Sequence, residues 1–451
     1  MKSASLFLSS MAYQLARDPL DLANKVSVRL RGQAMNSHAT FAPLGGSRKR
    51  DFDVPILTSS AALGEERVLQ VLTNSLPFSH GGYAHRSHEL LRALNSGGFE
   101  ASAITRLGYP AVIGRWPSRE TDVIDNVEYS RALPTWHPLS FSRSIRAQAN
   151  LIVEEAVQRR AGVLHTTTPW PNAAATSIAA QILGIPWVYE VRGEPESTWA
   201  AAQPHPEEAL ASEFYQSSKS KETEAMLAAA TVVVLSEVSL SEVRSRGVGR
   251  AHIIPNSVRE AELSRAIPPE DARAKLGLGS GPFIGAVSSI VDYEGFDNVI
   301  CALPYLPENV KALFVGDGSV LPALRELAAE LGVRDRVVFA GRQAPEEITD
   351  WYCALDVFVA PRKDTRVTRV VTPMKMQRAQ SFGIPVVCSD LPALREVTGG
   401  EAFYIPPDDP RALADTVLRA LDRGRETRAP SQISTWEMGA SRLIEMYRDL
   451  S

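Results

Sequence analysis

Short apolar segments alternate with predicted helices along the chain from residue 66 onward. The segments "RVLQVLT" at 67–73 and "FEASAITR" at 99–106 have the apolar and β-branched character of strands. Between them, "GYAHRSHELLRALNSGG" predicts a helix that ends at glycine. The alternation continues through the predicted strands "GVLHTT", "IPWVYEV", "TVVVLS" and "AHIIP". Short, nearly all-apolar strands separated by helices are typical of a parallel sheet covered on both faces.

The same alternation starts again after a polar, proline-containing stretch at 259–281. Its predicted strands are "FIGAVSS", "KALFVGDGS", "RVVFAG", "DVFVAP", "PVVCSD" and "EAFYIP". Two such series predict an α/β chain with two doubly wound, Rossmann-like domains that face one another across a cleft. We expect an irregular N-terminal extension over 1–65, a first domain over 66–258 and a second domain over 259–431.

Ligands of such sheets bind beyond the carboxyl ends of the strands, so the residues there are candidates for chemistry. Gly81 and Gly82 follow the first strand, where they suit a phosphate at a helix start or, equally, a plain tight turn. His165 suits acid–base catalysis or a hydroxyl contact, or it is a satisfied structural histidine. Glu190 and Arg192 are site residues, or an ion pair that holds their loop.

Two further strand ends are candidates in the second series. In "VGDGS", Gly316 lies at a helix start, which turn chemistry alone also explains. In "PRKDTRVTRVVTPMKMQR", Thr372 is the predicted N-cap of a helix and Pro373 its first residue. Six cations stand here against the single acid Asp364, which predicts a bound anion such as a diphosphate; they are Arg362, Lys363, Arg366, Arg369, Lys375 and Arg378.

Composition narrows the class of protein. The chain has 451 residues, of which 44% are hydrophobic and 22% charged, and a net charge of −4, so no global field attracts nucleic acid. The basic clusters are local and lack the interleaved aromatic residues of nucleic-acid sites. The three cysteines lie inside predicted helices or strands without metal-ligand spacing, which favours a reducing cytoplasm.

The N-terminal extension is basic, with Lys25, Arg29, Arg31 and "SRKR" at 47–50. It predicts weak peripheral contact with an anionic membrane surface, at the inner face of the membrane. No apolar run in the chain has the length of a membrane span. The acidic "DFD" at 51–53 follows no predicted strand, so we interpret it as a chance match to a metal-binding motif.

Seven motifs in this order resemble those of the retaining, nucleotide-sugar-dependent glycosyltransferases of family 4, in the GT-B class. They are "SHGGY", "YEVRGEPESTW", "IIPNSV", "VSSIVDYEGFDNVICAL", "FVGDGS", "VVFAGR" and "VTPMKMQRAQSFGIPVVCSDLPALREV". The last motif is the most specific, because it is similar to the proline–leucine–lysine variant of the family's donor helix. The resemblance covers about 66–450 and implies that a helix over 432–451 returns to the first domain.

The resemblance also implies a placement for each substrate. The nucleotide diphosphate lies between the domains, on the Gly81–Gly82 loop and on the helix that begins at Thr372. The base and ribose lie near Gly316, Arg342 and the 372–378 helix. Apart from the resemblance, Lys375, Arg362 and Arg366 are candidates to supply the phosphate charge. The acceptor approaches His165, Glu190 and Arg192, with His165 as the candidate catalytic residue.

Two positions depart from the family's pattern. Arg378 replaces a glutamate that holds the ribose hydroxyls, although an arginine cannot accept hydrogen bonds from a diol. Glu294 replaces a phosphate-binding lysine. We expect Arg378 to point at phosphate or to form a cross-domain ion pair, with Glu294 as one possible partner.

The predicted activity is transfer of a hexose-type sugar from a nucleoside-diphosphate sugar to a hydroxyl of a glycan or lipid-linked acceptor, in cell-surface polysaccharide or glycoconjugate synthesis. The resemblance implies retention of configuration, and neither a metal nor a cofactor. Two alternatives stay open at this point. One is a degenerate, non-catalytic protein that binds nucleotide or a partner, and the other is a sugar-nucleotide epimerase on the same scaffold.

Overall fold

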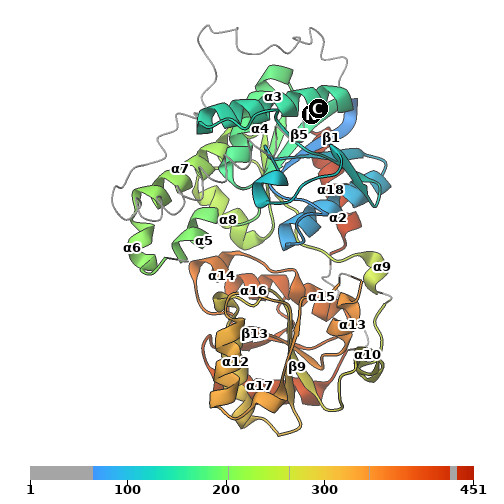
Figure 1. Ribbon diagram of the computed structural model, residues 1–451, viewed down its shortest axis with the longest axis vertical. Helices are drawn as coiled ribbons and strands as arrows, with labels where there is room; N and C mark the ends of the chain where they lie inside the picture. Colours follow the sequence, from blue (N-terminus) through green and yellow to red (C-terminus); the bar gives the residue numbers. More distant parts are fainter. Residues whose placement is uncertain (1–63, 202, 264, 345, 427–433, 451) are drawn as a thin grey trace. The chain divides into compact units, whose positions relative to one another are not determined.

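The computed structural model of the protein describes residues 64–201, 203–263, 265–344, 346–426 and 434–450 (Figure 1). The predicted extension and its membrane contact lie outside these residues, except for 64 and 65. The chain divides into two compact units. Unit 1 contains the described residues up to Leu235, then Ser239–Ile254, and those from Glu437 onward; unit 2 contains Ser236–Val238 and Pro255–Trp436. None of the helices in the described ranges has the length and hydropathy needed to cross a membrane.

Unit 1 is built on an eight-stranded sheet with the strand order β3-β4-β2-β1-β5-β6-β7-β8. All neighbouring pairs are parallel except β3 and β4. The central strands are almost fully buried, as the apolar pattern predicted. The strands are β1 (Gly64–Leu72), β2 (Glu100–Thr105), β3 (Thr121–Ile124), β4 (Val127–Ser130), β5 (Ala161–Thr167), β6 (Trp187–Val191), β7 (Thr231–Val234) and β8 (Ala251–Ile253).

Helices cover both faces of this sheet (Figure 1). Ser140 caps the longest of them by accepting a hydrogen bond from the Arg143 N–H, and Gly184 ends the next in the left-handed conformation. The helices are α2 (Gly82–Ser96), η2 (Ala111–Ile113), α3 (Phe141–Arg159), α4 (Trp170–Leu183), α5 (Pro195–Ala201), α6 (Pro206–Leu210), α7 (Glu213–Ala228) and α8 (Glu237–Ser245).

The hairpin of β3 and β4 is an element that the apolar pattern did not reveal. Its turn is formed by Asp125 and Asn126, whose φ angles of 48° and 62° are both left-handed. Asp and Asn tolerate that conformation better than most residues, and two of them between "TDVI" and "VEYS" are a hairpin signal. The signal was present in the sequence, but the strands on either side of the turn are short and weakly apolar.

Unit 2 is built on a six-stranded sheet with the order β11-β10-β9-β12-β13-β14, in which every pair is parallel. The strands are β9 (Phe283–Val287), β10 (Lys311–Val315), β11 (Val337–Gly341), β12 (Val357–Ala360), β13 (Val386–Ser389) and β14 (Phe403–Ile405). All six coincide with the predicted strands. Their side chains form one continuous apolar core with the surrounding helices.

The helices of unit 2 include two in the stretch 259–281, which the sequence predicted only as polar. Pro269 begins one of them and Gly277 ends it, so the usual start and stop residues were present there. The helices are α9 (Glu260–Leu263), α10 (Pro269–Leu276), η3 (Asp292–Glu294), α11 (Phe296–Ala302), η4 (Leu303–Tyr305), α12 (Leu321–Glu330), η5 (Arg334–Arg336), α13 (Ile348–Cys353), α14 (Arg366–Val370), α15 (Lys375–Ser381), α16 (Pro392–Val397) and α17 (Pro410–Arg423).

The last helix, α18 (Trp436–Arg448), packs on unit 1 beside α2 (Figure 1). The Tyr447 ring lies 5.4 Å from the Phe99 ring, and Arg92 on α2 forms an ion pair of 3.0 Å with Glu437. The side chain of Tyr447 is completely buried. The C-terminal segment is therefore part of the structure that supports the carboxyl ends of β1 and β5.

Candidate functional site

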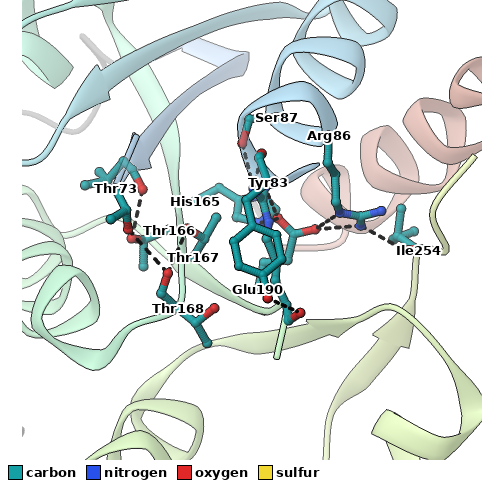
Figure 2. Close-up of polar contacts among 12 residues, drawn as sticks. Thr73, Tyr83, Arg86, Ser87, His165, Thr166, Thr167, Thr168, Glu190 and Ile254 are labelled. Atoms are coloured by element: carbon teal, nitrogen blue, oxygen red, sulfur yellow. Dashed lines mark hydrogen bonds and ion pairs between the residues drawn. The ribbon is translucent and has the colours of Figure 1, made fainter. Parts of the chain in front are cut away.

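A buried glutamate, Glu190, lies between two arginines at the carboxyl end of β6, and Figure 2 shows it beside one of them, Arg86. Glu190 Oε1 accepts from Arg86 Nε at 2.8 Å, and Glu190 Oε2 accepts from Arg192 Nε at 2.8 Å. All three side chains are at most 3% exposed. Burial alone would raise the pKa of Glu190, but the charges of Arg192 and Arg86 outweigh it and hold the pKa well below its usual range. This carboxylate is therefore ionised, and each of its oxygens accepts a hydrogen bond from an arginine.

The two arginines connect this carboxylate to the first turns of α2. Arg86 is itself on α2, and its Nη2 also donates to the carbonyl of Ile254 at 2.7 Å. Arg192 Nη1 donates to the Tyr83 carbonyl at 2.9 Å and to Ser87 Oγ at 2.7 Å. In return, the Tyr83 hydroxyl donates to the Arg192 carbonyl at 3.0 Å. The network thus fixes the start of α2 relative to β6.

That start of α2 is where Gly81 and Gly82 lie. Both are exposed, and Gly81 is the N-cap, with an ordinary φ of −75°. A Cβ at Gly81 would meet no atom within 4 Å, so packing among the described residues does not explain a glycine here. A 15-residue helix presents free N–H groups and a positive dipole end at its N-terminus. The geometry suits an anionic group that approaches the backbone closely.

His165 is completely buried at the carboxyl end of β5. Its Nδ1 lies 2.5 Å from the Tyr447 hydroxyl, and its Nε2 lies 3.7 Å from Glu190 Oε2. Burial lowers the pKa of His165 to about 4, so the ring is neutral at physiological pH. The predicted catalytic and acceptor-binding roles of His165, like those of Glu190 and Arg192, would require direct contact. The structure instead places all three inside a network that supports α2, and their contact with an acceptor stays a prediction.

Unit 2 holds a second buried glutamate between two cations. Glu294, beyond the end of β9, accepts from Arg362 Nη2 at 2.8 Å and forms an ion pair of 2.5 Å with Lys375 Nζ. Lys375 Nζ also lies 2.5 Å from Ser288 Oγ. Burial would raise the pKa of Glu294, but Arg362 and Lys375 lower it to about 2. Burial lowers the pKa of Lys375 to about 8, against the opposite effect of Glu294. The trio carries one net positive charge when Lys375 is protonated.

This geometry corrects one expectation about the exchanged charges. Glu294 does not pair with Arg378, and the ion pair that Arg378 forms lies within unit 2, not between the domains. Arg378 Nη2 instead lies 3.3 Å from Glu262 Oε1 on α9 and 3.4 Å from Thr349 Oγ1, with its guanidinium 5.4 Å from the Tyr352 ring centre. Sequence spacing did not indicate Glu262, because it belongs to the polar stretch in which no helix was predicted.

The excess of positive charge in the basic segment is also smaller than the sequence indicated. Lys363 pairs with Asp292 at 2.7 Å, and Arg369 pairs with Asp364 at 2.5 Å. Two of the acids that balance this segment, Glu294 and Asp292, come from the turn after β9, about 70 positions earlier in the chain. A local count of charges could not include them. The anion predicted here would compete with carboxylates already in place.

The start of the donor-type helix differs from the prediction. The helix begins at Lys375, with Met374 as its N-cap, and not at Thr372 and Pro373. The Thr372 carbonyl instead accepts from Asn256 Nδ2 at 3.1 Å, which holds the segment in a non-helical conformation. The Thr372 hydroxyl is buried and has no hydrogen-bond partner among the described residues. Thr372 is therefore a candidate ligand contact rather than a cap.

The remaining predicted donor residues differ in what their surroundings require. At Gly316, φ is 139° and a Cβ would lie 1.9 Å from the Ser288 carbonyl oxygen, so the turns after β9 and β10 need glycine to pack together. Arg342 follows β11 and is exposed, without an ion-pair partner in the part of the chain that the structure describes. Among the described residues, no group of three or more His, Cys, Asp or Glu residues has a geometry that would hold a metal ion.

Sequence reasoning missed several members of the unit 1 network. Arg86 carried a signal, because it lies on the same helix face as Leu90, Ala93 and Leu94. A charge on an apolar helix face predicts a buried partner. The contact of Tyr447 with His165 spans 282 positions, and no sequence pattern indicated it.

Comparison with known proteins identifies the class of protein that this fold and these strand-end clusters define. Residues 281–423 match the family described as glycosyl transferases group 1, and residues 81–257 match the glycosyl transferase 4-like domain. The chain belongs to the group 1, or family 4, glycosyltransferases, and its two parallel α/β sheets are the Rossmann-like sheets typical of the GT-B fold.

Two relatives show how far the similarity extends. The chain is 32% identical over 218 residues to D-inositol 3-phosphate glycosyltransferase of Xylanimonas cellulosilytica, which is 44% of this chain and 51% of the relative. It is 33% identical over 187 residues to the lipopolysaccharide core biosynthesis mannosyltransferase LpsB of Rhizobium meliloti, which is 38% of this chain and 51% of the relative. The chain thus spans about half the length of these curated relatives.

Solved structures share the fold over a larger part of the chain. Sucrose-phosphate synthase from Thermosynechococcus elongatus superposes with a TM-score of 0.68 at 19% identity, over 85% of this chain and 99% of that one. A glycosyltransferase from Rickettsia africae gives a TM-score of 0.64 at 15% identity, over 85% and 98%. At these identities the likeness establishes the architecture only.

Proposed function

We propose that the protein transfers a sugar from a nucleoside-diphosphate sugar to a hydroxyl of a glycan or lipid-linked acceptor, with retention of configuration and without a metal. The observation that carries this proposal is the order of the two family matches, 81–257 followed by 281–423, on two parallel α/β units. The names of the relatives, a glycosyltransferase of inositol phosphate and a mannosyltransferase of lipopolysaccharide core, support an acceptor of this kind.

Unit 2 is proposed to bind the donor, through the proline–leucine–lysine variant of the donor helix. Its support is the cluster beyond the ends of β9 and β12, where Lys375 and Arg362 carry more charge than Glu294 cancels. The Thr372 hydroxyl there has no hydrogen-bond partner among the residues that the structure describes. Departure of the nucleoside diphosphate builds negative charge, which fixed cations stabilise in a site with little water. Unit 1, with the helix start at Gly81 and Gly82 and with α18, is proposed to bind the acceptor and an anionic group of the substrates.

Release of nucleoside diphosphate tests the activity. The purified chain is incubated with UDP-, GDP-, ADP- and TDP-sugars, with and without glycan or lipid acceptors, and the released nucleotide and the product are analysed. We expect one donor to be consumed faster when an acceptor is present, with a new glycosidic bond in the product. Formation of an epimeric nucleotide sugar would replace the proposal by the epimerase alternative.

A matched pair of variants connects this activity to unit 2. Lys375→Ala removes a cation of the Glu294 trio, whereas Lys363→Ala removes a cation of the same basic segment whose partners are the more exposed Asp292 and Asp297. We expect a large loss of turnover for the first and a small one for the second. Equal losses would remove the site from the proposal while leaving the activity in place.

A second candidate function is nucleotide or partner binding without turnover. The observation that favours it is Arg378, which stands where the family's pattern has a ribose-binding glutamate. Its guanidinium pairs with Glu262 and offers the ribose no acceptor. Nucleotide binding in a thermal-shift assay, with no consumption of any donor, would select this alternative.

We further propose that the protein works at the inner face of a membrane, in cell-surface polysaccharide or glycoconjugate synthesis. The support is compositional and comes from the basic residues of the extension, which lie outside the described residues. A relative named for synthesis of a glycolipid, alpha-monoglucosyldiacylglycerol synthase of Streptococcus pneumoniae at 28% identity, agrees with this location.

A further inference from the structure

The surface of unit 1 carries large apolar side chains that the proposed reaction does not use. Trp136 is 66% exposed and Leu139 is 83% exposed, and both lie between β4 and α3. Ile113 and Trp116 are 40% and 43% exposed and lie between β2 and β3. Single exposed apolar residues are ordinary, but four of them in two segments that touch form a patch of the kind that marks an interaction site.

Contacts at Gly108 bring the two segments together. The Gly108 N–H donates to the Ala132 carbonyl at 2.7 Å. A Cβ at Gly108 would lie 2.8 Å from a methyl of Val112 and 3.0 Å from the His137 ring, so these side chains converge on it. Ile113 directly follows one of these neighbours, and Trp136 directly precedes the other. The two segments therefore meet beside Gly108, in the loops at the carboxyl ends of β2 and β4.

Arginines without acidic partners accompany the apolar residues. Arg115 lies between Ile113 and Trp116 in the first segment, Arg119 follows in the same segment, and Arg143 lies in the first turn of α3. All three are exposed, and none has an ion pair or acidic hydrogen-bond partner in the ranges that the structure describes. This differs from the basic segment of unit 2, where Lys363 and Arg369 have carboxylate partners.

We infer that this patch binds the surface of a bilayer that contains anionic lipid. Tryptophan is favoured at the level of the lipid headgroups, where its ring is apolar and its N–H remains hydrated. Arginine binds lipid phosphate while its methylene groups lie along apolar surface. A neutral glycan would also stack on tryptophan, but it would leave the three guanidinium groups without a function. The membrane patch is Ile113, Arg115, Trp116, Arg119, Trp136, Leu139 and Arg143.

Sedimentation of the full chain with vesicles tests the inference. We expect binding to vesicles of phosphatidylcholine with phosphatidylglycerol, and weaker binding to phosphatidylcholine alone. Trp136→Ser with Leu139→Ser removes two anchors and should lower binding by about tenfold or more. Arg115→Glu with Arg143→Glu should lower binding to the anionic vesicles by at least about tenfold, since each cation near such a surface contributes about fivefold.

A matched control comes from an exposed apolar residue and an exposed arginine of unit 2. Leu331 is 41% exposed and Arg334 is exposed as well, so Leu331→Ser with Arg334→Glu makes one change of each kind away from the patch. We expect this control to bind vesicles as the unchanged chain does. Leu139→Trp, at a position too exposed to disturb the core, should raise binding to anionic vesicles.

Four results would overturn the inference. The first is equal loss for the patch variants and the control, and the second is no gain from Leu139→Trp. The third is loss only when Arg48, Lys49 and Arg50 of the extension are changed to glutamate, which would assign the membrane contact to the extension. Binding of a soluble oligosaccharide that Trp136→Ser abolishes, with vesicle binding intact, would identify the patch as a glycan site instead.

Discussion

Each unit holds one buried glutamate between two cations at the carboxyl ends of its strands, but the two clusters differ in how completely they are satisfied. In unit 1, Glu190 is held by two arginines, and both of these also donate to carbonyl groups of the unit, those of Ile254 and Tyr83. The donors and acceptors of this cluster bond to one another, and the cluster fixes the start of α2. This cluster is a permanent part of the structure.

In unit 2, one of the two cations is a lysine. Glu294 is shared by Arg362 and Lys375, and the ammonium group of Lys375 also contacts Ser288. A lysine is a point charge with rotatable donors, and burial brings its pKa to about 8, whereas an arginine remains charged in a fixed fork. The difference indicates that the cluster of unit 1 has a structural role, whereas the lysine in the cluster of unit 2 can exchange its partner. The following predictions test this contrast.

The largest effect is expected from removing the glutamate of unit 1. Glu190→Ala leaves Arg86 and Arg192 buried without a counter-charge, which typically costs about 3–5 kcal/mol of folding free energy. Glu294→Ala should cost less, because Lys375 can become neutral. Urea unfolding of both variants, followed at equilibrium, measures the difference. A larger loss for Glu294→Ala would reverse the assignment of the permanent and exchangeable clusters.

The sequence predicted the alternation of strands and helices well, because a strand that is buried on both sheet faces consists of consecutive apolar residues. All six strands of unit 2 follow from such runs. The sequence indicated the local pair of Glu190 and Arg192, but it could not predict the pairs between distant positions, because Glu190 and Arg86 are 104 positions apart and Glu294 and Arg362 are 68 apart. Glycines illustrate the same limit: the pattern marked Gly81 and Gly316 alike, whereas only the structure separates an open helix start from a close-packed turn.

A second effect is the dependence of stability on pH that His165 confers. Its pKa falls from 6.5 in the unfolded chain to about 4 in the folded one, because burial disfavours the charged ring. Between these values the unfolded state binds more protons, so stability is complete above pH 6.5 and is lost as the pH falls toward 4. The loss is at most roughly 3 kcal/mol.

Thermal unfolding between pH 7 and pH 4 checks this window. His165→Asn has no titrating ring and should show a shallower fall, even if it is less stable at pH 7. The same slope in both proteins would mean that other groups cause the pH dependence, and that the ring is not held neutral by its place in the unit 1 cluster.

A third effect concerns ligand binding in unit 2. Lys375→Ala should weaken binding of a nucleoside diphosphate more than binding of the nucleoside, because only the former carries the charge that Lys375 meets. A charge-assisted contact of this kind contributes roughly 1.5–3 kcal/mol. Calorimetric titration of both ligands gives the comparison. Equal losses for the two ligands would show that Lys375 is structural, as the arginines of unit 1 are.

The smallest effect on stability is expected at Arg378. Its pair with Glu262 is partly exposed, so Arg378→Gln should cost no more than about 1 kcal/mol. Its effect on function distinguishes the two candidate functions. In a working transferase, Arg378 and Glu262 together form part of the site, and Arg378→Glu places two carboxylates against each other, so donor affinity and turnover should both fall.

The double variant Arg378→Glu with Glu262→Arg restores the pair with its charges reversed and serves as the control for repulsion. If the protein is a transferase, this double variant recovers stability but not donor binding, because the charge near the donor has the wrong sign. If the protein is a degenerate binder, nothing requires arginine at 378, and Arg378→Glu restores the carboxylate that the ribose of the family's donor would use. A gain of donor affinity or turnover in Arg378→Glu, from an inactive starting protein, would therefore replace the transferase proposal by the non-catalytic one.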